Sequence, residues 1–354
     1  MGFYKKTNDF FTETRAALLG GTTTIIDFAQ QEKGERLIEA LNKRKKRYEG
    51  KAQCSYTFHV AITEVQPDLF KQLEEIKIEG INSVKLYTTY DMKLSNEDIL
   101  KVMDYCSKLN MVVLVHCEED SIIKFSEDNL SFPCERPAEA EQNMVNTIIN
   151  FSKITGCVCY ICHVSSKESV ETIKKAKEQE VKVYLETCPQ YLLLEDSVYD
   201  RKTPEMTKYM LSPPLRKKKD NEVLIEACLD GTVDIISTDH CSFLFKDHKE
   251  KYYRNLKKAA KGMPGIQLRV SLMYDLLVEK HSMKISDFVK LLSYNPARIL
   301  GLEDRGYIKE GNLAHLVIWS RESFLVSKDI LEEGSDYSPY EGMEVIGKPK
   351  YVFI

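Results

Sequence analysis

Long apolar segments are missing from this chain. No stretch of its 354 residues approaches the roughly 18 apolar residues that a membrane helix needs, so we expect no contact with a membrane. The first residues, MGFYKKTNDFF, are polar and charged and contain no apolar signal core, so we expect a cytoplasmic protein. The formal net charge of −4 gives no overall positive field, which argues against nucleic acid as a partner.

Several functional signatures are also missing. No glycine-rich GxGxxG turn follows a predicted strand, and the chain shows no phosphate loop and no Ser/His/Asp triad spacing. Internal repeats and low-complexity segments are absent as well. A hydrophobic fraction of 43% with 29% charged residues is ordinary for a globular protein with a large core, which excludes a long disordered chain.

Ten cysteines are present, and six of them lie in or beside apolar runs. In a chain of this length we interpret them as reduced, buried thiols rather than as a disulfide framework. The closest group, Cys157, Cys159 and Cys162, has a spacing that fits no common zinc pattern. We therefore expect these three small side chains to pack in a strand.

Short apolar runs alternate with amphipathic helical stretches along most of the chain. Seven strands are predicted, at residues 22–28, 56–60, 83–87, 112–116, 158–163, 182–186 and 232–238. Helices are predicted at residues 35–48, 67–78, 96–109, 138–153, 167–179 and 221–229. This alternation indicates a parallel sheet covered on both faces, which is either a doubly wound open sheet or a closed eight-stranded barrel. The lack of a glycine-rich first turn favours the barrel.

The pattern changes after residue 239. A basic and aromatic loop at 243–261 leads to a tight GMPG turn, and helices are predicted at 266–279, 285–292 and 295–301. From residue 306 the sequence GYIKEGNLAHLVIWS predicts two short strands around a glycine turn. We interpret these strands as part of a small β appendage.

Four polar residues lie in or directly after the predicted strands: Lys85, His116, His163 and Asp239. Each alone is more often structural, as a hydrogen-bonded imidazole, a snorkelling lysine or a turn-capping carboxylate. In a barrel, however, the carboxyl ends of the strands meet at one mouth. Two imidazoles and a carboxylate there suggest a divalent cation site, next to which the lysine must be deprotonated, modified or paired.

Several short sequence blocks, in their order along the chain, make the interpretation more specific. They include INSVKLYTTY, VVLVHCEE, CHVSS, ETCPQYL, LSPPLR, ISTDHCSF, GMPGIQLR and NPARILGL. With these blocks the chain resembles the dihydropyrimidinase and D-hydantoinase family of cyclic amidohydrolases. The resemblance implies an α/β fold, a (β/α)8 TIM-type barrel with a small β-sandwich built from both ends of the chain. It also implies ring opening at two bridged metal ions, for which zinc is expected.

The resemblance assigns roles residue by residue. Lys85 matches the lysine that becomes a carbamate and bridges the metals, and His116 and His163 match ligands of the second metal. Asp239 matches a ligand of the first metal that also shuttles a proton. Tyr90 matches the tyrosine that polarises the substrate carbonyl.

Two further positions are implied to meet the substrate ring. Ser212, in LSPPLR, matches a backbone contact to the ring. Lys261 stands where the family usually has Asn before the GxPG turn. An ammonium group only donates hydrogen bonds, so Lys261 is expected to favour a substrate that bears a carboxylate or another acceptor.

The chain also departs from the family pattern. The family opens on a strand with His-x-His, which supplies two ligands of the first metal, whereas this sequence contains no His-x-His. The chain therefore resembles a member shortened at both ends, with a barrel that lacks its first strand at 1–305 and a partial β-sandwich at 306–354. We expect at most one tightly bound metal, impaired activity, and a homo-oligomer formed through exposed strand edges.

These observations predict a metal-dependent hydrolase that opens a dihydropyrimidine- or hydantoin-type ring, with a small cyclic amide or ureide as partner. Two alternatives stay open. One is a non-catalytic interaction protein on the same scaffold, as in the collapsin response mediator proteins. The other is a hydrolase like the allantoinases or dihydroorotases.

Overall fold

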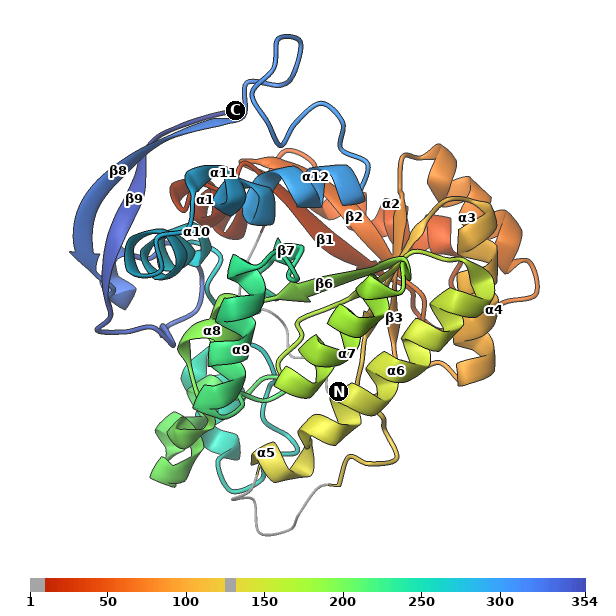
Figure 1. Ribbon diagram of the computed structural model, residues 1–354, viewed down its shortest axis with the longest axis horizontal. Coiled ribbons are helices and arrows are strands. Elements are labelled where there is room, and N and C mark those ends of the chain that lie inside the picture. Colours follow the sequence, from red (N-terminus) through yellow and green to blue (C-terminus); the bar gives the residue numbers. More distant parts are fainter. Residues whose placement is uncertain (1–9, 125–131) are drawn as a thin grey trace.

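The computed structural model describes residues 10–124 and 132–354 and has an α/β fold built on one parallel sheet (Figure 1). The seven strands of this sheet lie in sequential order and are all parallel. They are β1 (Thr24–Gln30), β2 (Ser55–Ala61), β3 (Ser83–Tyr87), β4 (Val112–His116), β5 (Cys159–Ile161), β6 (Val183–Thr187) and β7 (Ile235–Ile236). This curled parallel sheet is consistent with the TIM-type barrel predicted from the sequence.

Helices cover the outer face of the sheet (Figure 1). Those between the strands are α2 (Leu37–Tyr48), α3 (Leu69–Ile78), α4 (Asn96–Lys108), α5 (Phe132–Glu135), α6 (Ala138–Thr155), α7 (Lys167–Glu178) and α9 (Lys218–Leu229). The hydroxyls of Ser95 and Ser166 cap α4 and α7 by accepting the backbone N–H groups of Asp98 and Ser169. Gly156 ends α6 with a left-handed φ of 68°. These signals lie close in sequence, so the predicted helices between strands agree with the observed ones to within a few residues.

The seventh strand is shorter than the predicted 232–238 and consists only of Ile235–Ile236. Two backbone carbonyls there accept side-chain donors. Asn295 Nδ2 donates to the carbonyl of Asp234 over 2.8 Å, and Arg269 Nη1 donates to the carbonyl of Ile236 over 2.9 Å. Arg269 Nη2 also donates to Thr22 Oγ1 over 3.2 Å, so this guanidinium connects β7 to the segment that precedes β1.

Several elements were not predicted. Helix α1 (Phe10–Leu19) precedes β1, and the connection after β6 contains α8 (Pro189–Leu193) with the 3-10 turns η1 (Asp196–Arg201) and η2 (Pro204–Tyr209). The loop after β7 holds η3 (Phe245–Lys249) and η4 (Glu250–Tyr252). The segments in which helices were predicted at 266–279, 285–292 and 295–301 contain alternating α and π turns. They consist of α10 (Arg269–Met273), η5 (Tyr274–Lys280), α11 (Ile285–Val289), η6 (Lys290–Tyr294) and α12 (Asn295–Ile299).

A separate two-stranded antiparallel ribbon forms the C-terminal part (Figure 1). Its strands are β8 (Leu316–Leu325) and β9 (Glu344–Phe353), with the 3-10 turn η7 (Lys328–Ile330) between them. Of the two strands predicted around the glycine turn in 306–320, only the second is observed, as the start of β8, and the predicted hairpin was wrong. Gly306 and Gly311 both have positive φ, in turns that leave no extended segment before Leu316, and the partner of β8 lies beyond residue 343.

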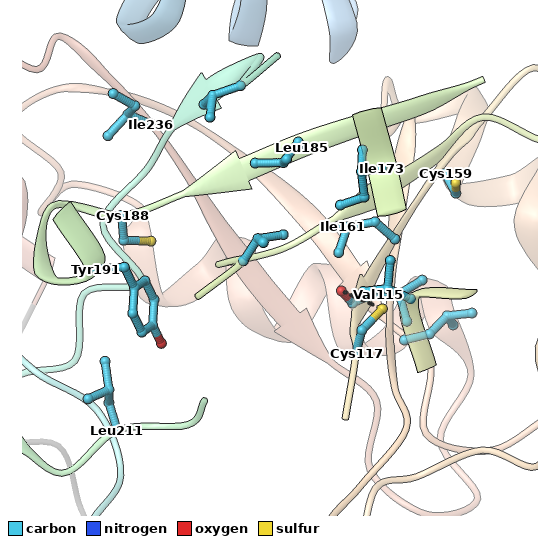
Figure 2. Close-up of a cluster of buried hydrophobic side chains, with 14 of the residues drawn as sticks. Val115, Cys117, Cys159, Ile161, Ile173, Leu185, Cys188, Tyr191, Leu211 and Ile236 are labelled. Atoms are coloured by element: carbon cyan, nitrogen blue, oxygen red, sulfur yellow. Dashed lines mark hydrogen bonds between the residues drawn. The ribbon is translucent and has the colours of Figure 1, made fainter. Parts of the chain in front are cut away.

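The core lies between the sheet and its helices, and Figure 2 shows part of it around β4 to β7. Val115, Ile161 and Leu185 from neighbouring strands pack together with Ile173 of α7. All ten cysteines are free thiols, and Cys157, Cys159 and Cys162 are buried as predicted, although only Cys159 lies within a strand, β5. No helix within residues 10–124 and 132–354 is long and apolar enough to cross a membrane.

Candidate active site

The four polar residues singled out at the strand ends line one large cavity, of about 2630 Å³. Lys85 lies within β3, His116 ends β4, His163 follows β5, and Asp239 follows β7. The cavity is also lined by Tyr90, Ser212 and Lys261. Because parallel strands place their carboxyl ends on the same side of a sheet, residues far apart in the sequence meet here.

Three of the candidate residues have backbone conformations that side chains rarely adopt. Tyr90, His163 and Asp239 have φ values of 72°, 41° and 45°, in the left-handed region. Residues held in that region cost of order 1–3 kcal/mol each and cluster at functional sites. The turns after β3, β5 and β7 therefore direct these side chains at an energetic cost.

The two histidines face each other. Nδ1 of His116 lies 3.0 Å from Nε2 of His163, with ring centroids 4.7 Å apart. Burial lowers the pKa of both imidazoles, so both are neutral at pH 7. Nδ1 of His163 is buried and makes no hydrogen bond within the described part of the chain. The pair thus presents two converging nitrogens and one unsatisfied polar atom.

A buried ion pair supports His116 from the other side. Glu118 Oε2 lies 2.7 Å from Nε2 of His116, and Arg136 Nε donates to Glu118 Oε1 over 3.0 Å. Burial alone would raise the pKa of Glu118, but the charge of Arg136 and the hydrogen bond from His116 together lower it to about 2. Glu118 is therefore an anion that accepts hydrogen bonds from both neighbours.

Tyr90 belongs to the same cluster. Arg136 Nη2 lies 3.3 Å from the phenol oxygen of Tyr90, and its guanidinium carbon lies 5.1 Å from the ring centroid. Burial raises the pKa of Tyr90, which keeps the phenol neutral at physiological pH. A neutral phenol can donate a hydrogen bond to a carbonyl oxygen in the cavity.

Lys85 is buried between aromatic and thiol groups. Its Nζ lies 5.4 Å from the ring centroid of Tyr87 and 5.9 Å from that of Phe28. Burial lowers the pKa of Lys85, but the neighbouring Cys162 and Tyr87 outweigh that effect and raise it overall. Lys85 in this environment is an ammonium, which binds no metal unless it is deprotonated or modified.

The two residues expected at the substrate ring lie on loops. Ser212 is buried at the wall of the cavity. Lys261 Nζ donates to the backbone carbonyls of Leu256 over 2.7 Å and Lys257 over 2.8 Å. Burial lowers the pKa of Lys261 to about 8. Two of its three donors therefore hold the loop, which leaves one for a ligand.

His240, next to Asp239, is held by its neighbours. Its Nδ1 accepts the backbone N–H groups of Gly265 and Ile266 over 3.1 and 3.2 Å, and its Nε2 lies 2.5 Å from Glu13. These contacts join the segment after β7 to helix α1 and to the turn that precedes α10. His240 thus fixes the turn on which Asp239 sits.

The fit to a metal ion is partial. Within residues 10–124 and 132–354, no three His, Cys, Asp or Glu side chains form a group that could hold a metal. The His116–His163 pair does fit a divalent ion, because two buried nitrogens converge and a carboxylate orients one of the rings.

Sequence reasoning missed Glu118 and Arg136. Glu118 could have been found, since it lies two residues after His116 in VVLVHCEE. Arg136 follows Glu118 by 18 residues and has no spacing signal. Only the folded chain brings its guanidinium to the end of β4.

The chain belongs to the amidohydrolase family, which it matches over residues 7–354. Members of this family generally depend on divalent metals.

Relatives of the chain include proteins named D-hydantoinase. The chain is 32% identical to a D-hydantoinase of Ralstonia pickettii, over 98% of this chain and 78% of that protein. It is 35% identical to a D-hydantoinase of Geobacillus stearothermophilus, over 97% of this chain and 76% of that protein.

Two solved structures carry the same fold. A D-hydantoinase from Bacillus sp. AR9 superposes with a TM-score of 0.96 at 33% identity, covering all of this chain and 81% of the other. A dihydropyrimidinase from Brevibacillus agri NCHU1002 superposes with a TM-score of 0.95 at 31% identity, covering 98% and 78%.

Proposed function

We propose that this chain is a hydrolase that opens cyclic amide rings of the hydantoin and dihydropyrimidine type. The observation that carries the proposal is the His116–His163 pair beside the Tyr90 phenol in one cavity, in a chain of the amidohydrolase family. The names of the relatives support the ring type. The C–N bond that is cleaved is an amide bond of the ring rather than a peptide bond.

The chain's own residues divide the work. Tyr90 donates its phenol proton in a hydrogen bond to the ring carbonyl and stabilises the oxyanion that develops there. The carboxylate of Asp239 takes a proton from the attacking water and returns it to the leaving ring nitrogen. Ser212 contacts the ring, and Lys261 presents its remaining donor to an acceptor on the substrate.

A divalent metal would be held by Nδ1 of His116 and Nε2 of His163, with Asp239 and a modified Lys85 as further candidates. When bound, it supplies a water of lowered pKa. We propose zinc, because imidazole nitrogen and carboxylate oxygen suit it, and at most one tightly held ion per chain.

We propose a TIM-type barrel without its first strand at 1–305 and a partial β-sandwich at 306–354. The β8–β9 ribbon supports the second unit. The ten free thiols support a reducing compartment, the cytoplasm.

The test is a hydrolysis assay on the metal-loaded protein with hydantoin, dihydrouracil, allantoin and dihydroorotate. We expect loss of hydantoin and dihydrouracil, and a decrease in rate of at least about a hundredfold in Tyr90→Phe. Turnover of allantoin or dihydroorotate alone would instead support those hydrolases. The control is Tyr294→Phe, a partly exposed tyrosine on η6.

A second candidate is a non-catalytic interaction protein. Two observations favour it: the absence of His-x-His from the sequence, and the lack of a complete three-residue metal group in the described residues. No hydrolysis by a well-folded, metal-loaded protein that forms a defined homo-oligomer would support this candidate over the enzyme.

A further inference from the structure

The buried ion pair Glu118–Arg136 contacts two candidate site residues at once. Glu118 and Arg136 are 0% and 1% exposed, so neither charge is screened by solvent. Removing two charges from water costs several kcal/mol per ion, and such a pair is weak support for stability. Its contacts, however, reach His116 on one side and Tyr90 on the other.

The hydrogen-bond directions within this cluster are determined. Arg136 can only donate, and it donates to both oxygens of Glu118. Glu118 as an anion can only accept, so Nε2 of His116 must carry the proton at their contact. The neutral ring then has its lone pair on Nδ1. That lone pair points at Nε2 of His163, 3.0 Å away.

We propose that Glu118 and Arg136 are positioning residues: the pair fixes the tautomer of His116 with Nδ1 toward His163, and the same guanidinium holds the Tyr90 phenol. One ion pair would thereby set both the imidazole that faces the candidate metal and the phenol that faces the substrate carbonyl. The inference rests on the proposed function for the meaning of these roles, but the tautomer itself does not.

The same contacts determine which nitrogens of His116 and His163 carry protons when no metal is bound. With Nδ1 of His116 as acceptor, Nε2 of His163 must donate, and its proton then occupies the position that a metal would take. A divalent ion held at Nε2 of His163 would require the proton to be on Nδ1, a buried atom that makes no hydrogen bond within the described part of the chain. His116 would need no such proton shift, because Glu118 keeps the proton of His116 on Nε2 and leaves the lone pair on Nδ1.

The first test measures the tautomer of His116 directly. Imidazole ¹⁵N NMR of the metal-free protein, with His116 assigned by His116→Ala, should show a neutral ring protonated at Nε2. In Glu118→Leu the single tautomer should give way to a mixture. A wild-type His116 protonated at Nδ1, or a tautomer unchanged in Glu118→Leu, would overturn the proposal.

The second test is zinc affinity by calorimetry on the full chain. Loss of a carboxylate behind a ligating imidazole typically weakens binding 10–100-fold, and we expect that range for Glu118→Leu. Glu118→Gln keeps an acceptor oxygen and should restore part of the affinity. The control is Asp220→Asn, another buried carboxylate, which accepts the backbone N–H groups of Lys167 and Lys217 outside the cavity. Equal affinities in Glu118→Leu and Asp220→Asn would contradict the inference.

The tests separate this inference from the proposed function. A protein that hydrolyses no cyclic amide but shows the predicted tautomer and the zinc effect refutes the enzyme and keeps the positioning role. An active enzyme in which His116 is protonated at Nδ1 keeps the proposed function and refutes the positioning role.

Discussion

The two sides of the cavity satisfy their charges in different ways. On the side of β4, charged groups bind one another directly, and Glu118, Arg136 and His116 are nearly inaccessible. On the side of β1 and β7, the described strands have one sheet neighbour each, and side chains such as Arg269 bond to the backbone. The β8 strand nearby leaves Ile318 49% exposed. The β4 side is thus held by buried charged groups that bind one another, whereas the β1 and β7 side is held by side chains that bond to the backbone and to a hydroxyl.

The largest effect should come from removing the two imidazoles on the buried side of the cavity. In the double variant His116→Ala/His163→Ala, tightly bound divalent metal should disappear, because both converging nitrogens are removed. Elemental analysis of purified protein measures this. The exposed His281→Ala serves as control, and an unchanged metal content in the double variant would reject the pair as ligands.

Stability should respond next. Glu118→Leu leaves the charge of Arg136 buried and unpaired, which typically costs about 3–5 kcal/mol of unfolding free energy. The double variant Glu118→Leu/Arg136→Met should recover part of that loss. Denaturant unfolding gives both values. Asp104→Asn, which breaks the exposed pair with Lys108, should change stability little, and an equal cost at both sites would erase the contrast between buried and exposed charges.

The open side of the cavity, at β1 and β7, should affect the oligomeric state of the protein. Unpaired strand edges and exposed apolar side chains favour pairing with another chain, so we expect an oligomer. Ile318→Lys should raise the monomer fraction in light scattering coupled to gel filtration. Ile78→Lys, an isolated and 85% exposed residue on α3, should not. A wild-type monomer with a cooperative thermal transition would contradict this expectation.

The smallest effect is expected at Lys261. Lys261→Asn exchanges one available donor for an amide, which is worth up to about tenfold in the preference between neutral and carboxylated rings. The rate ratio for such a substrate pair measures it. Lys261→Met removes the charge without adding an amide and separates the two contributions. An unaltered ratio in both variants would remove Lys261 from the substrate site.

The parts of the molecule that sequence could predict are those with short-range signals. Strands β3 and β4 were predicted at their observed bounds because β-branched and apolar residues end there in polar ones. Strand β9 was missed as the partner of β8, since the pairing of Leu316 with Phe353 is non-local. The π turns of η5 and η6 depend on packing rather than on periodicity.

The candidate site divides in the same way. Lys85, His116, His163 and Asp239 could be proposed because each lies in or follows a predicted strand, and the family resemblance gave them roles. Arg136 could not be proposed from the sequence, because its contact with Glu118 forms only in the folded chain. Glu118 lay within a recognised block, but its carboxylate gains meaning only from the orientation of the His116 ring.

Arg269 joins two segments on the open side of the cavity that no main-chain ladder joins in the described part of the chain. Its guanidinium connects the carbonyl of Ile236 to the hydroxyl of Thr22, and burial lowers its pKa to about 10 while leaving it charged. Main-chain ladders hold strands at a fixed spacing, but this connection runs through a side chain with several rotatable bonds. Within the described residues, β7 is therefore joined to the segment before β1 by a side chain, and one substitution at Arg269 removes both hydrogen bonds of that connection.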